Sequence, residues 1–183
     1  MSTTFSESLR SALGGAAAHV AASNAASAQF FERQADAVAR ACHAMAARFQ
    51  RGGRLLAYGE GAQRSDVSHV VVEFVHPVIV GKRALPAVAL ATPGVLDVLG
   101  RPEDVLMLLC AATPTESEGA LLERAKASGM LVLALTGTAP DVDANFHFAV
   151  PSDDPLVVQE THEMLYHVLW ELVHVFLEHR ATP

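Results

Sequence analysis

The chain has 183 residues, of which 51% are hydrophobic and 18% are charged, and its formal net charge is −7. This length predicts a single domain over residues 1–183. Within it, we expect residues 1–50 to form N-terminal helices used in oligomerisation, and residues 53–183 to form an α/β core with a C-terminal helix. The negative charge, without any cluster of Lys or Arg, argues against binding of nucleic acid or of an anionic membrane surface. The apolar fraction is high for a small soluble monomer, so we expect a homo-oligomer.

Neither a membrane span nor a secretory leader is expected from the sequence. No apolar run reaches the roughly 20 residues that cross a bilayer, and the first residues lack a basic stretch followed by an apolar one. Cys42 and Cys110 are far apart and form no C-x-x-C motif, so we expect two core residues rather than a zinc knuckle or a redox pair. These features predict a cytoplasmic protein.

The segment from Phe5 to Gln50 contains no proline and is rich in alanine. Its large apolar residues recur at roughly helical spacing, which predicts two helices with a break near Ser23 and Asn24. Small side chains allow helices to approach closely. We therefore expect this segment to take part in contacts between subunits.

Five short apolar segments alternate with helical patterns through the rest of the chain. Strands are predicted over residues 55–58, 85–90, 105–110, 130–135 and 146–150. Helices are predicted after the first strand, over residues 118–128, and over a long apolar stretch that spans residues 156–179. Continuous apolar strands that alternate with helices are typical of a parallel sheet covered on both faces.

The first predicted strand ends in a glycine turn, Gly59-Glu60-Gly61, that leads into a helix. Unpaired amides at a helix N-terminus carry partial positive charge, so such a turn favours anionic ligands. An ordinary structural turn is an equally good interpretation of the glycines alone. The helix then carries His69 and Glu73, whose i, i+4 spacing puts both side chains on one face. One segment therefore combines a candidate anion site with two titratable groups.

A second loop, from Ala112 to Ser117, precedes another predicted helix. Thr113, Thr115 and Ser117 offer hydroxyl groups to a phosphate, whereas Glu116 brings negative charge. Because hydroxyls and carboxylates also cap helix N-termini, ordinary capping explains this loop at least as well as phosphate binding.

The long last helix carries Gln159, Glu163 and His167 at steps of four, so these polar groups form one stripe on an otherwise apolar helix. Polar groups in such a place need partners or a function. His162, Glu163 and His167 also approach the zinc protease motif, but the two histidines are five residues apart where the motif needs four. We therefore reject a protease.

Two separated motifs resemble the sugar isomerase (SIS) domain family. Within it, the chain is most similar to the sedoheptulose 7-phosphate isomerase (phosphoheptose isomerase) branch, which includes the DnaA initiator-associating protein. The segment Gly59–Gln63 stands where the family has G-N-G-G-S, and Asp66, His69 and Glu73 match the spacing of its D-x-x-H-x-x-x-E motif. Residues 83–90 match R-x-x-P-A-I-A-L.

The second motif lies in the last helix, so the resemblance covers nearly the whole chain. Val158–His162 matches the family's I-Q-E-x-H, and His167 follows Gln159 by eight residues, as in the family. The resemblance implies a three-layer αβα sandwich of the flavodoxin type with five parallel strands and a long C-terminal helix. It also implies a homotetramer or homodimer with active sites between subunits.

The resemblance assigns chemistry to these residues. It implies zinc held by His69, Glu73, Gln159 and His167, with Glu73 as the catalytic base and His167 as the catalytic acid. The implied reaction is the aldose-ketose isomerisation of a sugar phosphate. Substrate-binding positions are implied at Gln159 and in the two loops, at Gly59, Glu60, Gly61, Gln63, Thr113, Thr115 and Ser117.

Three departures from the family pattern indicate an altered ligand or a binding role. Only Thr113 and Ser117 remain of the family's S-T-S-G-N-S loop, Gln63 replaces a serine, and Pro77 replaces an arginine. The segment over residues 90–101 is also much shorter than in the isomerases, which removes a helix and an aspartate. The alternatives to an isomerase are a non-catalytic SIS module for ligand-regulated protein assembly and a metal-site accessory protein.

Overall fold

The computed structural model describes the backbone of residues 2–179 and the side chains of residues 10 and 12–178. The side chains of Phe5, where the predicted helical segment begins, and of Leu9, an apolar residue within it, lie outside the described residues. The elements follow in the order α1 (Ser2–Gln50), β1 (Leu55–Gly59), α2 (Gln63–Val75), β2 (Ala87–Ala89), α3 (Val95–Leu99), β3 (Val105–Leu109), α4 (Glu116–Ala127), β4 (Leu131–Thr136), β5 (Phe146–Ala149) and α5 (Pro155–His179).

The five strands form one parallel sheet in the order β2-β1-β3-β4-β5. Every residue of β1, β3 and β4 is buried, which agrees with their unbroken apolar sequences. The predicted parallel α/β sheet is confirmed. Because β1 lies between β2 and β3, the chain leaves β1 and β3 toward opposite sides of the sheet, and ligands of such folds bind at this switch point, beyond the carboxyl ends of the strands.

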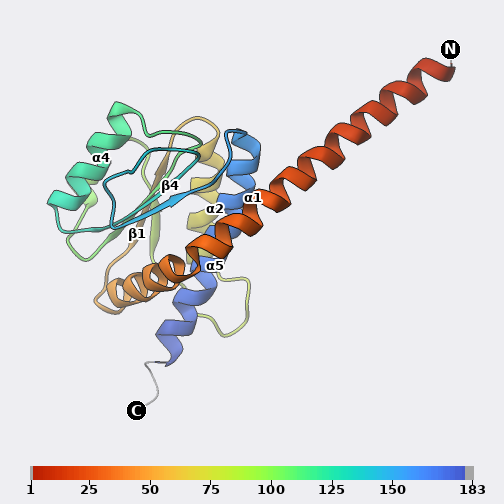
Figure 1. Cartoon of the computed structure of the whole chain (residues 1–183). Helices are drawn as coiled ribbons and strands as arrows, with labels where there is room; N and C mark the ends of the chain where they lie inside the picture. Colours follow the sequence, from red (N-terminus) through yellow and green to blue (C-terminus); the bar gives the residue numbers. More distant parts are fainter. Residues whose placement is uncertain (1, 180–183) are drawn as a thin grey trace.

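Two apolar layers cover the sheet, as Figure 1 shows, with α4 on one side and α1, α2 and α5 on the other. Alternate residues of β1 point to opposite faces: Leu55 packs with α1, α2 and α5, and Leu56 packs with α3 and α4. Cys42 and Cys110 lie in these two layers as buried free thiols, as predicted. Burial raises the pKa of the Cys42 thiol to about 12.

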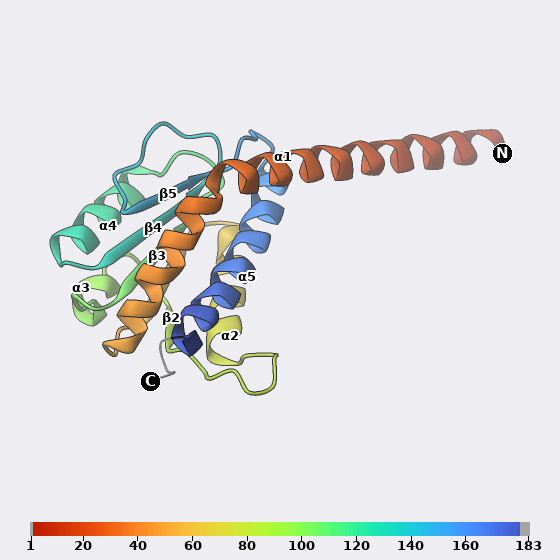
Figure 2. The same ribbon diagram turned by 60° about the horizontal axis from the view of Figure 1, so that its bottom comes forward.

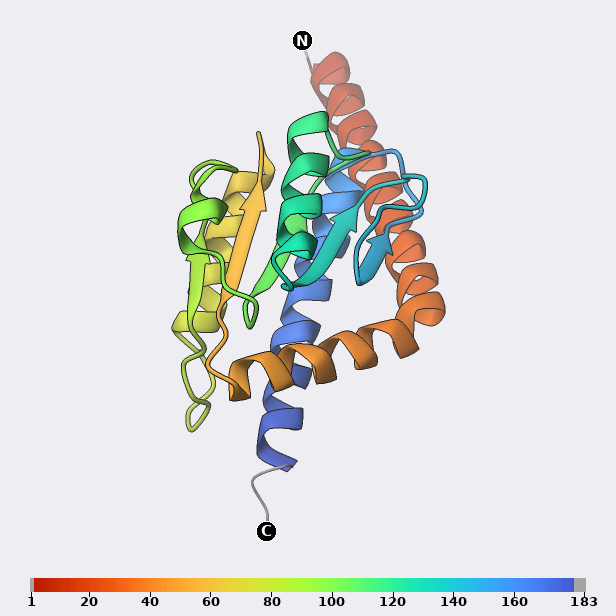
Figure 3. The same ribbon diagram turned by 90° about the vertical axis from the view of Figure 1, so that its left-hand side faces the viewer.

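The N-terminal segment is a single helix, α1, so the prediction of a break near Ser23 and Asn24 is wrong. Hydroxyls break helices when they compete for the helix's own backbone, but here they bond to α5. The Ser23 hydroxyl donates to the Glu160 carboxylate, and the Ser27 and Thr161 hydroxyls lie 3.0 Å apart. The N-terminal part of α1 extends away from the rest of the chain (Figure 2), and the helix changes direction within its orange part (Figure 3).

The sequence did not predict the short helix α3. It lies in the segment over residues 90–101 that is shorter than in the isomerases. Its five residues are too few to show a helical period, and only Leu96 among them is buried. Among the described residues, no helix is both long and apolar enough to cross a membrane.

His162 joins α5 to the end of β4. Its Nε2 donates to the Thr136 carbonyl oxygen over 3.1 Å, and the side chain is fully buried. Burial lowers the pKa of His162 to about 4, so the imidazole is neutral in the folded protein at neutral pH.

Replacing His162 by Gln is expected to flatten the pH dependence of stability. In the unfolded chain His162 takes up a proton below about pH 6.5, whereas in the folded chain it does so only near pH 4. Its contribution is therefore complete above pH 6.5 and decreases as the pH falls, by roughly 3 kcal/mol in total at pH 4. Urea unfolding at pH 7.0 and pH 5.0, at one protein concentration, should show a smaller change for the variant than for wild type. Equal changes in both proteins would contradict this role.

Candidate active site

The turn after β1 requires glycine. A Cβ on Gly59 would lie 2.8 Å from the Leu109 carbonyl oxygen and 2.9 Å from the Gln63 Cβ, which is too close for any other residue. Gly61 has a φ of +58°, a backbone conformation that glycine adopts without steric cost. This tight turn starts α2 directly at the carboxyl end of β1, beside the switch point of the sheet.

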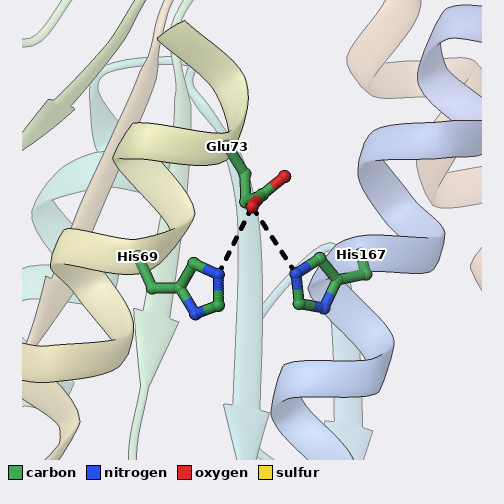
Figure 4. Close-up of side chains that lie close together, drawn as sticks. All are labelled: His69, Glu73 and His167. Atoms are coloured by element: carbon green, nitrogen blue, oxygen red, sulfur yellow. Dashed lines mark ion pairs between the residues drawn. The ribbon is translucent and has the colours of Figure 1, made fainter. Parts of the chain in front are cut away.

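Three polar side chains from α2 and α5 point toward one another, as Figure 4 shows. His69 Nε2 lies 3.4 Å from Glu73 Oε1, and His167 Nε2 lies 3.8 Å from the same oxygen. One ligand atom from each of the three residues lies within 4.8 Å of the others. The two helices meet here because both pack on the same face of the sheet, through Val70 of α2 and Leu169 of α5 among others.

The three groups fit a zinc ion chemically and geometrically. Imidazole nitrogen and carboxylate oxygen are ordinary zinc ligands, and in a tetrahedral site with bonds of about 2.1 Å the ligand atoms lie about 3.4 Å apart. The distances of 3.4 and 3.8 Å are close to this value. Glu73 is the least exposed of the three, with 14% of its side chain accessible against 38% for His69 and 40% for His167.

The other ring nitrogen of His69 has its own partners. The Tyr166 hydroxyl lies 2.9 Å from His69 Nδ1, and Glu163 Oε1 lies 3.8 Å from it. Tyr166 is fully buried. Burial raises the pKa of its hydroxyl, and the charges of Glu163, Asp66 and Glu73 raise it further, so Tyr166 is neutral at neutral pH.

Gln159, the fourth predicted ligand, bonds to a residue outside the cluster. Its Nε2 donates to Asp66 Oδ1 over 3.1 Å. Asp66 is buried, its Oδ2 has no hydrogen-bond partner among the described residues, and burial raises the pKa of its carboxyl group. Because Asp66 engages the amide nitrogen, the amide oxygen of Gln159 is the atom that remains to bind a ligand.

The turn after β1 contains four of the predicted substrate-binding residues. The Glu60 carboxylate accepts a hydrogen bond from the Tyr58 hydroxyl over 2.6 Å, and Gln63 is buried. A cavity of about 200 Å³ opens beside Gly59, between α2 and the end of β2, and Arg64 lines it. Arg64 is therefore a cationic side chain that lies beside this turn.

The loop after β3 is largely used in capping α4. The Thr115 hydroxyl accepts from the Glu118 amide over 3.2 Å, and the Glu118 carboxylate accepts in turn from the Thr115 amide and hydroxyl. Of the other two predicted residues here, Thr113 lines a second cavity, of about 230 Å³, and Ser117 is exposed in the first turn of α4. Neither this cavity nor the one beside Gly59 is lined by His69, Glu73 or His167.

Sequence reasoning assigned no role to Asp66 or Tyr166, although both contact the candidate site. Asp66 precedes His69 by three residues, so helical spacing alone places it near that face. Tyr166 gives a weaker signal, because an aromatic residue on an apolar helix usually belongs to the core.

Comparisons with known proteins identify close relatives. A phosphoheptose isomerase from Desulfovibrio desulfuricans is 30% identical over 169 residues, which cover 81% of this chain and 80% of that protein. One from Thermodesulfovibrio yellowstonii is 28% identical over 166 residues, covering 79% and 83%. No protein-family model matches the chain.

Solved structures agree on the fold. A phosphoheptose isomerase from Francisella tularensis superposes with a TM-score of 0.77 at 23% identity, over 88% of this chain and 97% of that one. One from Neisseria gonorrhoeae gives 0.76 at 24% identity, with the same coverage. The sequence relatives cover most of both chains, so this protein belongs to the phosphoheptose isomerase family within the SIS fold.

Proposed function

We propose that this protein is a phosphosugar isomerase that interconverts an aldose and a ketose at the His69, Glu73 and His167 cluster. One observation carries the proposal: two imidazoles and a carboxylate lie within 4.8 Å of one another, although His167 on α5 is 94 positions from Glu73 on α2. The relatives named phosphoheptose isomerase support the reaction class.

Aldose-ketose isomerisation moves one proton between adjacent carbons and needs no external oxidant. In the proposal, the Glu73 carboxylate takes the proton from the carbon next to the carbonyl, and the carbonyl oxygen receives a proton, which forms an enediol. His167 is the acid that protonates this oxygen. A proton then adds to the former carbonyl carbon, and the hydroxyl on the adjacent carbon loses its proton to become the new carbonyl.

Zinc is part of the proposal because His69, Glu73 and His167 supply ligand atoms at suitable distances. The amide oxygen of Gln159 is the proposed fourth protein ligand, because the bond between its nitrogen and Asp66 leaves that oxygen free to accept. When bound, zinc would polarise the substrate carbonyl and make the neighbouring C–H more acidic.

An oligomer is proposed because the histidines of the cluster are more than a third exposed in the single chain. Large apolar side chains are exposed as well: Val72, Val78, Ile79, Val80, Leu156 and Met164. A second subunit that covers these residues would also exclude water from the site. A homotetramer or homodimer in the cytoplasm, where sugar phosphates are retained by their charge, completes the proposal.

The direct test is turnover of sedoheptulose 7-phosphate by the purified full-length protein with zinc, run in D₂O. We expect an aldose phosphate to form, with deuterium on the carbon that receives the proton, because a carboxylate base exchanges its proton with solvent. No conversion and no deuterium uptake, with sedoheptulose 7-phosphate and with a panel of other sugar phosphates, would contradict the isomerase.

The second candidate is a non-catalytic SIS module for ligand-regulated protein assembly. The capping of α4 favours it, because the Thr115 hydroxyl bonds to Glu118 and a buried carboxylate lies where a phosphate would bind. This candidate predicts a stable stoichiometric protein partner and no turnover of any sugar phosphate. The isomerase predicts turnover.

A further inference from the structure

Tyr166 occupies a place beside the cluster that the proposed reaction does not use. Its hydroxyl is 2.9 Å from His69 Nδ1, and its ring lies against both histidines, with centroid separations of 5.4 Å to His69 and 4.9 Å to His167. The ring belongs to the buried core on this face of the sheet. The packed ring thus places the Tyr166 hydroxyl beside Nδ1 of His69, a candidate metal ligand.

The two nitrogens of His69 face different surroundings. Nε2 faces Glu73 Oε1 at 3.4 Å, and Nδ1 faces the Tyr166 hydroxyl at 2.9 Å and Glu163 Oε1 at 3.8 Å. In a neutral imidazole one nitrogen donates and the other accepts, and the partner of one decides what the other can do. The group that holds Nδ1 therefore controls how Nε2 is presented to the cluster.

A tyrosine hydroxyl can pair with Nδ1 in both tautomers. When Nε2 carries the proton and donates to Glu73, the Tyr166 O–H donates to Nδ1. When Nε2 offers its lone pair to a metal, Nδ1 carries the proton and the Tyr166 oxygen accepts it. A carboxylate such as Glu163 can only accept, so it pairs with Nδ1 in the second state alone.

We propose that Tyr166 is a positioning residue that holds the His69 ring through Nδ1, so that Nε2 stays directed at the point shared with Glu73 and His167. The inference rests on the proposed metal site. The torsion that turns an imidazole ring is otherwise broad, and a 2.9 Å bond from a buried side chain restricts it. Partners of this kind are typically worth 10- to 100-fold in metal affinity.

The hydroxyl can be removed without disturbing the core. In Tyr166→Phe the ring remains among its apolar neighbours, and Nδ1 loses its partner. In the variant, Glu163 Oε1 is 3.8 Å from Nδ1, beyond hydrogen-bond distance, so the ring must turn to pair with it or with water. That turn would move Nε2 away from the point shared with Glu73 and His167, whereas a metal bound at Nε2 would keep the ring in place and leave Nδ1–H without a close partner. The loss therefore falls mainly on the metal-bound state.

The experiment compares zinc affinity of the full chain, measured by competition with a chromogenic chelator, in wild type, Tyr166→Phe and Tyr58→Phe. Tyr58 is the matched control, because it is also buried and its hydroxyl donates to Glu60 over 2.6 Å, outside the cluster. We expect Tyr166→Phe to bind zinc about 10- to 100-fold more weakly, and Tyr58→Phe to bind like wild type. Wild-type affinity in Tyr166→Phe would overturn the inference and leave the proposed site intact.

A second measurement separates this inference from the metal proposal. The ¹⁵N chemical shifts of His69 in the metal-free protein report which nitrogen carries the proton. We expect the Nε2–H form in wild type and a shift toward the other tautomer in Tyr166→Phe, where Glu163 becomes the main partner of Nδ1. If wild type binds no zinc, the metal proposal fails, and the ¹⁵N shifts still decide the positioning role: identical shifts in both proteins would overturn it.

Discussion

Replacing Glu73 by Gln is expected to lower kcat on a sugar phosphate by roughly 10²- to 10⁴-fold, the usual contribution of a positioned acid or base. Gln has nearly the same shape as Glu but cannot take up the proton from carbon. Glu73 is only partly buried and is within 4 Å of both histidines, so the variant should keep its fold. Steady-state kinetics and a thermal melt measure the two effects separately.

The matched control is Glu171→Gln, which makes the same chemical change at an exposed position of α5, four residues after His167. It should retain wild-type turnover. Deuterium exchange gives a second readout, because Glu73→Gln should also stop solvent exchange at the substrate carbon. If Glu73→Gln exchanges and turns over like wild type, another group is the base.

Replacing His167 by Ala is expected to weaken zinc binding by more than about 100-fold, since a direct ligand contributes more than a group that only bonds to a ligand, which is worth 10- to 100-fold. It should also remove turnover, because the same residue is the proposed acid. Zinc content after dialysis and kcat with added zinc are the measurements. His167 is 40% exposed, so the fold should tolerate the loss of its side chain.

His19→Ala is the control for this variant. His19 also lies near two carboxylates, 3.1 Å from Glu160 and 3.8 Å from Asp154, but at the N-terminal end of α5. It should keep wild-type zinc content and activity. Loss of zinc from His167→Ala with full turnover would instead support a metal-site accessory role, in which the metal does not take part in isomerisation.

Much of the fold could be predicted from local sequence pattern. All five strands were recognised as short apolar segments, although only β1, β3 and β4 are buried throughout. The α2 pair of His69 and Glu73 follows from helical spacing alone. The continuity of α1 could not be predicted, because it depends on α5, whose Glu160 and Thr161 bond to Ser23 and Ser27. Such contacts join residues more than 130 positions apart.

The candidate site shows the same limit. Helical spacing places His167 on a polar stripe with Glu163, but nothing local to α5 says that this stripe meets α2. That pairing came from resemblance to a family. The role of the Tyr166 hydroxyl is harder still to recognise, because it depends on a 2.9 Å contact with His69 on another helix. In the sequence, Tyr166 looks like any other aromatic core residue of an apolar helix.

Anomalous diffraction at the zinc edge, from crystals of the full chain grown with zinc, tests most directly whether α2 and α5 together form one ligand site. We expect one peak per chain, within roughly 2.0–2.2 Å of His69 Nε2, a Glu73 carboxylate oxygen and His167 Nε2. A peak elsewhere, or none while these three side chains are ordered, would contradict a zinc-dependent isomerase at this place in the fold.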